Sequence, residues 1–216
     1  MIGSLLYSAA TRPDISFSAG VCARYQADPR EQHILAVKRI IRYVNSTLNY
    51  GLRYSSESNS EIAGYTDADW AGNKDDRKST SSGCFYISTN LFSWYSKKQN
   101  CISLSSCEAE YIAAGNCCTQ LLWMKQMLQD YGVDRSTISI FCDNTSTINI
   151  SKNPVLHYKI KHIDIRHHFL RELVEQNVVS LEKVHTDQNL ADILTKPLDA
   201  HKFSHFRKSI GVCCLD

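Results

Sequence analysis

Two acidic residues occupy matching places in this 216-residue chain, because each ends a short apolar run. Asp67 ends "EIAGYTD" and Asp143 ends "TISIFCD". If the two runs are neighbouring strands of one sheet, both carboxylates leave it at the same edge, where oxygen ligands can hold a hard cation such as Mg²⁺. Aspartates at such places also serve as turn residues or helix caps. A cation site is therefore predicted only if further acids arrive from other elements.

Two glutamates near the start of a long apolar segment have different expected roles. Ser105 and Glu108 have the spacing of a capping box, which gives Glu108 a structural role at the helix start. Small and apolar residues follow Glu110 at helical spacing: Ala113, Ala114, Cys117 and Leu121. Glu110 therefore lies on the face that can approach a sheet closely. A carboxylate there is costly to bury unless it is paired or bound to metal, so Glu110 is the candidate ligand on this helix.

A fourth candidate, Asp192, lies in the first turn of "NLADILTK", where a carboxylate also interacts favourably with the helix dipole. Each acid alone has a structural explanation. No single structural explanation accounts easily for all four acids in the order strand, helix, strand, helix. Two Mg²⁺ or Mn²⁺ ions held ~4 Å apart by such a set support phosphodiester chemistry. Asp69 shares the sheet face of Asp67 if the strand continues, so we expect Asp69 to support the site from outside the ligand set.

The elements that must position these acids follow a mixed α/β pattern. A long helix is expected over 104–131, closed by Gly132. The predicted strands are 61–67, 82–88, 91–99, 137–143 and 178–184. Three strands followed by alternating helices and strands indicate a mixed five-stranded sheet flanked by helices. The predicted fold class is therefore α/β, with a small helical segment before the sheet.

Three parts are expected along the chain. The polar stretch "SSESNS" marks a boundary, so residues 1–55 form a helical segment and residues 56–200 form the sheet domain. Residues 201–216 are expected to be a C-terminal tail. Within the helical segment, Asp28 and Pro29 predict the start of a helix with an acidic cap and proline at its first position.

The helix predicted after Pro29 is amphipathic. Its apolar stripe consists of Ile34, Val37, Ile41 and Val44. Lys38, Arg39 and Arg42 lie largely off this stripe. Bases in such places usually form a solvated helix face, and contact with a nucleic acid is the alternative.

The composition is that of a globular protein, with 43% hydrophobic residues, 21% charged residues and a net charge of +2. Acidic residues predominate in the middle of the sequence and basic residues on both sides, which suits a cation site beside a polyanion. The nine cysteines show neither C-x-x-C nor zinc-binding spacing and are expected to be free thiols of an intracellular protein. No apolar run approaches the ~20 residues of a membrane span, so no membrane partner is expected.

Histidines form a second group with metal-binding side chains. "HIDIRHH" contains His162, Asp164, His167 and His168. On a helix these side chains do not share one face well, so a packed, hydrogen-bonded helix is favoured over a transition-metal site. His185 precedes "NLADILTK" and is either an exposed loop residue or a functional group beside the acids.

The segments "SEIAGYTDADWAGNKDDRKSTSSGCFYI", "SLSSCEAEYIAA", "IFCDNTSTI", "KHIDIRHHF" and "LADILTKPL" together resemble the ribonuclease H end of copia-type LTR-retrotransposon Pol polyproteins. The basic leader resembles the segment between the reverse transcriptase palm and that domain. The likeness covers nearly the whole chain and is closest to plant elements. It implies a ribonuclease H-like fold preceded by the tail end of a reverse transcriptase.

The resemblance also implies an activity, which is metal-dependent cleavage of the RNA strand of RNA–DNA hybrids. Matched motif by motif, the metal ligands and catalytic acids would be Asp67, Glu110, Asp143 and Asp192. Ribonucleases H often carry a mobile histidine that assists product release or proton transfer, a role that His185 would take here. The basic residues Lys38, Arg39 and Arg42 would then contact the phosphate backbone of the hybrid.

Implied partners are the RNA–DNA hybrid and the remaining Pol polyprotein, in a cytoplasmic particle or the nucleus. A non-catalytic remnant that binds nucleic acid or Pol partners is the alternative function. A transposase or integrase of the same fold is a third reading, and Glu110 counts against it. No Tyr-x-Asp-Asp polymerase motif occurs, so the chain is not expected to copy nucleic acid by itself. The sequence departs from the family pattern at Tyr158, Lys159 and Ile160, where substrate contacts are expected to differ.

Overall fold

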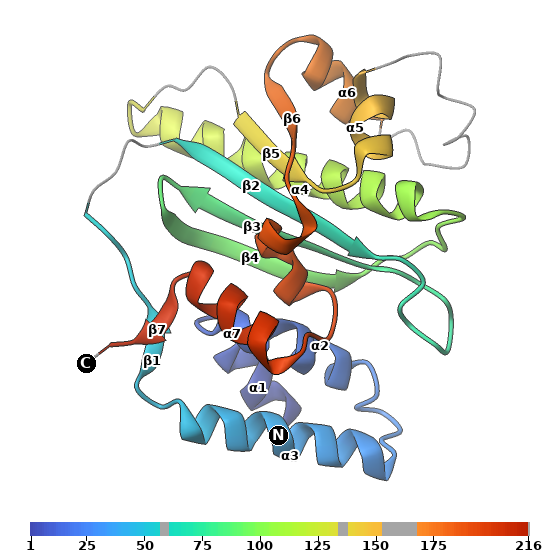
Figure 1. Ribbon diagram of the computed structural model, residues 1–216, viewed down its shortest axis with the longest axis vertical. Helices are drawn as coiled ribbons and strands as arrows, with labels where there is room; N and C mark the ends of the chain where they lie inside the picture. The colour runs from blue at the N-terminus through green and yellow to red at the C-terminus, as the bar shows by residue number, and fades with distance from the viewer. Residues whose placement is uncertain (57–60, 134–137, 153–167, 216) are drawn as a thin grey trace.

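The protein folds around a mixed five-stranded sheet with the strand order β4-β3-β2-β5-β6 (Figure 1). The computed structural model describes residues 1–56, 61–133, 138–152 and 168–215. The strands are β2 Ile62–Asp69, β3 Thr80–Ile87, β4 Asn90–Lys98, β5 Ile138–Cys142 and β6 Val179–Lys183. β3 is antiparallel to both its neighbours, and β5 is parallel to both of its own. The predicted fold class, a mixed five-stranded sheet flanked by helices, is confirmed.

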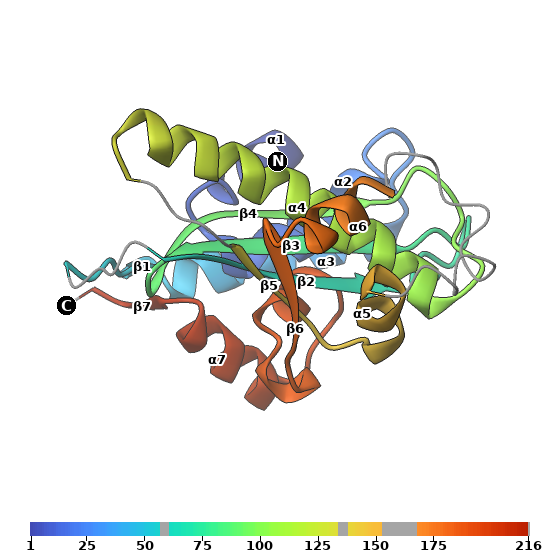
Figure 2. The ribbon, with the colours of Figure 1, turned by 90° about the horizontal axis from the view of Figure 1, so that it is seen from above.

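Helices cover both faces of this sheet, and Figure 2 shows α4 and α7 on opposite sides of it. One face is covered by α4 (Ser106–Asp130), α5 (Thr145–Lys152) and α6 (His168–Glu175). The other is covered by the 3₁₀-helix η5 (Leu190–Leu194) and α7 (Ala200–Ser209). Each face has its own apolar cluster, so the sheet is the middle layer of three. Among the described residues, no helix combines the length and apolar character that crossing a membrane requires.

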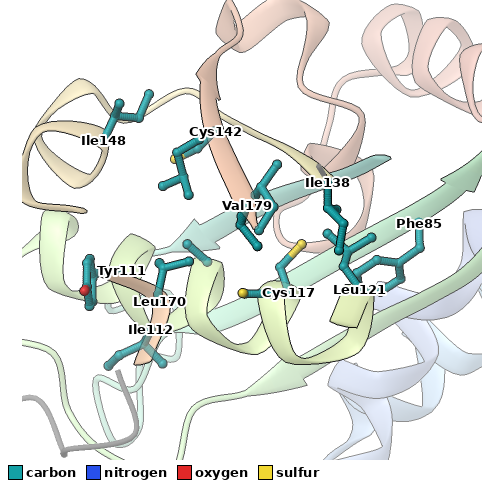
Figure 3. Packing of buried hydrophobic residues seen from close by; sticks show 14 of the residues in the cluster. Phe85, Tyr111, Ile112, Cys117, Leu121, Ile138, Cys142, Ile148, Leu170 and Val179 are labelled. Atoms are coloured by element: carbon teal, nitrogen blue, oxygen red, sulfur yellow. The ribbon is translucent and has the colours of Figure 1, made fainter. Parts of the chain in front are cut away.

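Close contact between α4 and the sheet depends on small side chains. The helix buries Ala113, Ala114 and Cys117 completely, as the sequence predicts for this face. Figure 3 shows Cys117 and Leu121 pointing from α4 into the apolar cluster. On the sheet side, a Cβ added at Gly64 would lie 2.8 Å from Leu121 Cδ1 and 3.0 Å from Cys117 Sγ. Glycine in β2 therefore allows the helix to approach closely, and that approach brings Glu110 to the sheet.

The N-terminal segment folds as three helices, α1 (Ile2–Ser8), α2 (Ser16–Ala23) and α3 (Glu31–Ser46), with an apolar cluster of its own. A buried polar network joins the turn before α2 to the end of α3. Within it, the Arg12 guanidinium donates to both carboxylate oxygens of Asp14, at 2.9 and 2.8 Å. The same guanidinium donates to the backbone carbonyl and the hydroxyl of Thr47, at 3.0 and 2.9 Å. The "TRPD" turn is thus bonded to the end of α3.

The apolar face of α3 differs from the predicted stripe. Val37 and Ile40 are 6% and 8% exposed, whereas Ile34 and Ile41 are 42% and 41% exposed. The apolar cluster that α3 joins is formed with α1 and α2, and Tyr43 also contacts Phe203 of α7. These neighbours leave part of the apolar pattern uncovered. The predicted start at Pro29 is also wrong, because the helix begins at Glu31. The cap is Arg30, whose backbone N–H donates to His33 Nδ1 at 3.0 Å.

Residues 201–216 were predicted to be a tail, but their described part is folded. Most of it belongs to α7 and to β7 (Val212–Cys214), which pairs antiparallel with β1 (Tyr50–Leu52) (Figure 1). The Arg207 guanidinium lies 4.6 Å from the centre of the Tyr50 ring, which adds a cation–π contact to this pairing. The chain after residue 200 therefore closes back onto the end of the N-terminal segment.

The N-terminal segment also contacts the sheet. Trp94 on the edge strand β4 donates from Nε1 to the carbonyl of Ala9 at 3.1 Å. Tyr25 donates from its hydroxyl to Asp75 Oδ2, in the loop between β2 and β3, at 2.7 Å. Covering an edge strand in this way blocks its pairing with another chain.

Candidate metal centre

Three aspartates converge at one edge of the sheet. Tyr65 of β2 pairs with Phe141 of the parallel strand β5, so Asp67 and Asp143 each lie two residues beyond this pair. Asp192 reaches the same place from η5, and one carboxylate oxygen from each aspartate lies within 4.8 Å of the others. Asp67 and Asp192 are buried while Asp143 is partly exposed, so the cluster opens to solvent on the Asp143 side.

Glu110 joins the cluster from the first turns of α4. One of its carboxylate oxygens lies within 4.8 Å of an Asp143 oxygen and of Cys142 Sγ. Burial is the main reason that the pKa of Glu110 is well above its usual range, and the charges of Asp67 and Asp143 raise it further. Glu108 has the separate role predicted for it, because its carboxylate accepts from the Leu104 N–H at 2.6 Å while its own N–H donates to Ser105.

Hydrogen bonds fix the orientation of two of the aspartates. The Thr195 hydroxyl donates to Asp67 Oδ2. The Thr186 hydroxyl donates to Asp143 Oδ2 at 2.9 Å, and Lys183 Nζ donates to the Asp143 backbone carbonyl. These donors come from the end of β6 and from the segment that follows it, which also supplies Asp192.

A lysine ammonium completes the cluster. Lys196 Nζ lies 3.0 Å from Asp192 Oδ2 and 3.6 Å from Asp67 Oδ1. Burial raises the pKa of Asp67, although Lys196 and Thr195 oppose that shift. Burial and the charge of Asp67 raise the pKa of Asp192 to about 7. Burial by itself would lower the pKa of Lys196, but the carboxylates of Asp67 and Asp192 outweigh it and raise this pKa.

The donor set fits a hard divalent cation. Glu110 Oε2 and Asp192 Oδ1 are buried and have no hydrogen-bond partner among the described residues. Buried carboxylate oxygens without a partner are costly, and a cation would satisfy them. Cys142 Sγ also lies close, and burial raises the pKa of its thiol. Thiolates are soft ligands, so the carboxylate oxygens are the better match for a hard cation. The site therefore offers oxygen ligands of the kind that Mg²⁺ and Mn²⁺ prefer.

Some residues predicted for the site lie outside the cluster. Asp69 is half-buried near it, and burial and the charge of Asp67 raise the pKa of Asp69. A Cβ added at Gly72 would lie 1.7 Å from Asp69 Oδ2, so the carboxylate is turned towards the loop after β2. The His185 side chain is 74% exposed and lies 3.7 Å from Asp187. It is one residue from Thr186, which holds Asp143, but it does not itself contact the four acids.

The predicted basic residues lie apart from the acids. Lys38, Arg39 and Arg42 are exposed on α3, which Figure 1 shows away from the sheet, beyond α2 and α7. His162, Asp164 and His167 lie outside the described residues, as do Tyr158, Lys159 and Ile160. His168 begins α6, and its side chain is outside the described part as well.

The sequence reasoning missed Lys196 and both threonines. Lys196 follows Asp192 by four residues within "LADILTK", a spacing that brings two side chains together on one helical turn. This spacing could have identified Lys196 from the sequence. The contact of Thr195 with Asp67 joins parts far apart in the chain, and no local pattern indicates it.

Comparison with known proteins relates the chain to transposon polyproteins. No protein-family model matches it. The chain is 40% identical over 212 residues to the retrovirus-related Pol polyprotein from transposon TNT 1-94 of Nicotiana tabacum, which covers 98% of this chain and 16% of that protein. It is 39% identical over 214 residues to the corresponding polyprotein from transposon RE1 of Arabidopsis thaliana, covering 98% of this chain and 14% of that protein. The chain thus spans about a sixth of the length of these relatives.

The solved structures that the chain matches include ribonucleases H. The N-terminal RNase H domain of rv2228c from Mycobacterium tuberculosis matches with a TM-score of 0.44 and 9% identity, over 70% of this chain and 99% of that one. LC11-RNase H1, solved in complex with an RNA/DNA hybrid, matches with a TM-score of 0.45 and 16% identity, over 62% of this chain and 94% of that one.

Proposed function

The chain belongs to the retrovirus-related Pol polyproteins of plant transposons, and we propose that it is the ribonuclease H part of a copia-type element. In this proposal it is a metal-dependent endonuclease that hydrolyses the RNA strand of RNA–DNA hybrids during reverse transcription. The observation that carries the proposal is the convergence of Asp67, Glu110, Asp143 and Asp192 at one solvent-open edge of the sheet.

These four carboxylates would hold two Mg²⁺ or Mn²⁺ ions. When bound, such ions activate the attacking water and stabilise the leaving oxygen of an in-line phosphodiester displacement. The protein's own contribution is to pre-orient the ligands. Thr195 holds Asp67 and Thr186 holds Asp143, so both carboxylates keep their direction before a cation arrives. The sheet face beneath α4 keeps Glu110 away from bulk water.

The polyanionic substrate would lie over the Asp143 side of the cluster, where the site is open. The loop between β2 and β3 is at this end of the sheet, and three of its residues are basic: Lys74, Arg77 and Lys78. Lys97, near the end of β4, is exposed as well. Positive charges beside the acidic edge would contact phosphates without reading sequence.

The bases of α3 take a secondary place in this proposal. Lys38, Arg39 and Arg42 are exposed, and a hybrid long enough to extend past the acidic edge would reach them. His185 remains a candidate for product release, because it is exposed beside the residue that holds Asp143. The nine cysteines show neither C-x-x-C nor zinc-binding spacing, which suits a reducing compartment. We therefore place the activity inside the cell, in a cytoplasmic particle or the nucleus.

Site variants test the assignment of the acids. We expect Asp67→Asn and Glu110→Gln each to reduce hybrid cleavage by at least about a hundredfold, because each removes a charged metal ligand. Binding of the hybrid, measured by fluorescence anisotropy, is expected to persist. Asp130→Asn is the matched control, since Asp130 is exposed at the far end of the same helix as Glu110.

Full cleavage by Asp67→Asn or Glu110→Gln would remove the site assignment. A folded wild-type chain that binds the hybrid and never cuts it would favour the alternative function, a non-catalytic remnant that binds nucleic acid or Pol partners. The chain spans about a sixth of the length of these relatives, so we test it for both functions, cleavage and binding alone.

A further inference from the structure

Lys196 places an ammonium group inside the acidic cluster. Its Nζ lies 3.0 Å from Asp192 Oδ2 and 3.6 Å from Asp67 Oδ1. Among the described residues, Lys196 is the one cationic side chain at ion-pair distance from both Asp67 and Asp192. Both aspartates are almost fully buried, so the ammonium neutralises charge that water does not reach well.

The lysine is held loosely compared with the acids that it contacts. Its side chain is 32% exposed, whereas those of Asp67 and Asp192 are 2% and 5% exposed. A four-carbon stem with a compact charge can rotate into solvent without moving the backbone. The ammonium therefore has a route out of the cluster, and the two aspartates do not.

The segment that carries Lys196 is anchored by other contacts. Asn189 Nδ2 donates to the carbonyl of Thr66 in β2 at 3.0 Å. Ser82 in β3 donates to the carbonyl of Ala191 at 3.0 Å, and η5 buries Ile193 and Leu194 against the sheet. None of these contacts involves Lys196, so the charge of this lysine can be removed while the anchors of Asp192 remain.

From this geometry we infer that Lys196 is an internal counter-ion that a divalent cation must displace from Asp67 and Asp192. The inference rests on the proposed function, because it takes the four acids to be the metal site. An ammonium and a divalent cation cannot both occupy the space between the same two carboxylates. Lys196 therefore stabilises the metal-free protein and weakens metal binding by competition.

Measuring metal affinity without substrate tests this inference. The probe is Mn²⁺ titrated into the full chain, followed by electron paramagnetic resonance of the free ion. We expect Lys196→Met to bind Mn²⁺ about tenfold more tightly than wild type, since it removes a competing unit charge that lies 3.0 and 3.6 Å from two ligand oxygens. In EDTA the same variant is expected to melt at a lower temperature than wild type, because two buried carboxylates lose their counter-ion.

The matched control is Lys202→Met. Lys202 pairs with Asp187 at 3.1 Å, but both side chains are more than half exposed and neither belongs to the cluster. This control is expected to leave both the Mn²⁺ affinity and the melting temperature in EDTA unchanged. If Lys196→Met fails to fold by circular dichroism, Lys196→Gln is measured in the same way, since it keeps a hydrogen-bonding group without the charge.

The results separate this inference from the proposed function. Unchanged or weaker Mn²⁺ binding by the Lys196 variant, with wild type binding Mn²⁺ normally, would overturn the inference and leave the proposed function standing. If neither protein binds Mn²⁺, the metal site itself is wrong, and both proposals fall.

Discussion

The buried network around Arg12 gives a quantitative prediction about the N-terminal segment. The variant Asp14→Asn removes the carboxylate that neutralises the Arg12 guanidinium. The two side chains are 9% and 0% exposed, and the carboxylate also accepts from the Tyr43 hydroxyl at 2.6 Å. The variant therefore leaves a buried charge without a partner.

The expected loss follows from that burial. Breaking a buried pair by removing one partner costs about 3–5 kcal/mol, and asparagine keeps one acceptor, so we expect about 3 kcal/mol. Part of the guanidinium remains satisfied by Thr47. For a chain of this size, 3 kcal/mol lowers the melting temperature by roughly 6 to 12 °C.

Thermal and urea unfolding followed by circular dichroism measure this loss. The matched control is Glu175→Gln, which breaks an exposed pair with Arg171 at 2.8 Å and should cost less than about 1 kcal/mol. The double variant Arg12→Met with Asp14→Leu should recover most of the stability, because it leaves no buried charge. A loss from Asp14→Asn no larger than that of the control would refute the reasoning.

Two further predictions concern the sheet and the acidic site. Gly64→Val should destabilise the protein by about 1–3 kcal/mol, because the added atoms meet Leu121 and Cys117. Gly3→Ala in α1 meets nothing within 4 Å and removes a glycine from a helix, so it should not destabilise the protein; urea unfolding compares the two. In EDTA, the raised pKa of Asp192 means that the folded state holds its proton more tightly than the unfolded state. Its contribution to stability is therefore present below about pH 4 and is lost as the pH rises towards 7. In EDTA, the melting temperature of wild type should therefore fall between about pH 4 and pH 7, and that of Asp192→Asn should fall less. If the melting temperatures of the two proteins depend on pH in the same way, Asp192 is not the cause.

The elements that position the acids were predictable because their patterns are local. Apolar runs predicted the strands, and the small residues after Glu110 indicated the sheet-facing side of α4. The parallel pairing of β2 with β5 then determined where Asp67 and Asp143 leave the sheet. Strand ends and helical spacing thus indicated Asp67, Asp143 and Glu110, although β2 continues past Asp67 to Asp69.

The parts that were not predictable depend on contacts between distant segments. The pairing of β7 with β1 makes residues 201–215 part of the fold, and nothing in "RKSIGVCCLD" alone indicates its partner. The buried face of α3 follows from how α1 and α2 cover it, so the apolar residues Ile34 and Ile41 stay largely exposed. The buried pair of Arg12 and Asp14 was not predicted, because the network that it forms includes Thr47 at the end of α3.

The measurement that tests the central claim most directly is incubation of the purified chain with an RNA–DNA hybrid labelled on each strand in turn. Mg²⁺, Mn²⁺ and EDTA are compared, and single-stranded and duplex RNA serve as controls. The four converging carboxylates predict cutting of the RNA strand of the hybrid with either metal and none in EDTA. Cutting that persists in EDTA, or no cutting by a folded chain that binds both the hybrid and Mn²⁺, would contradict the account.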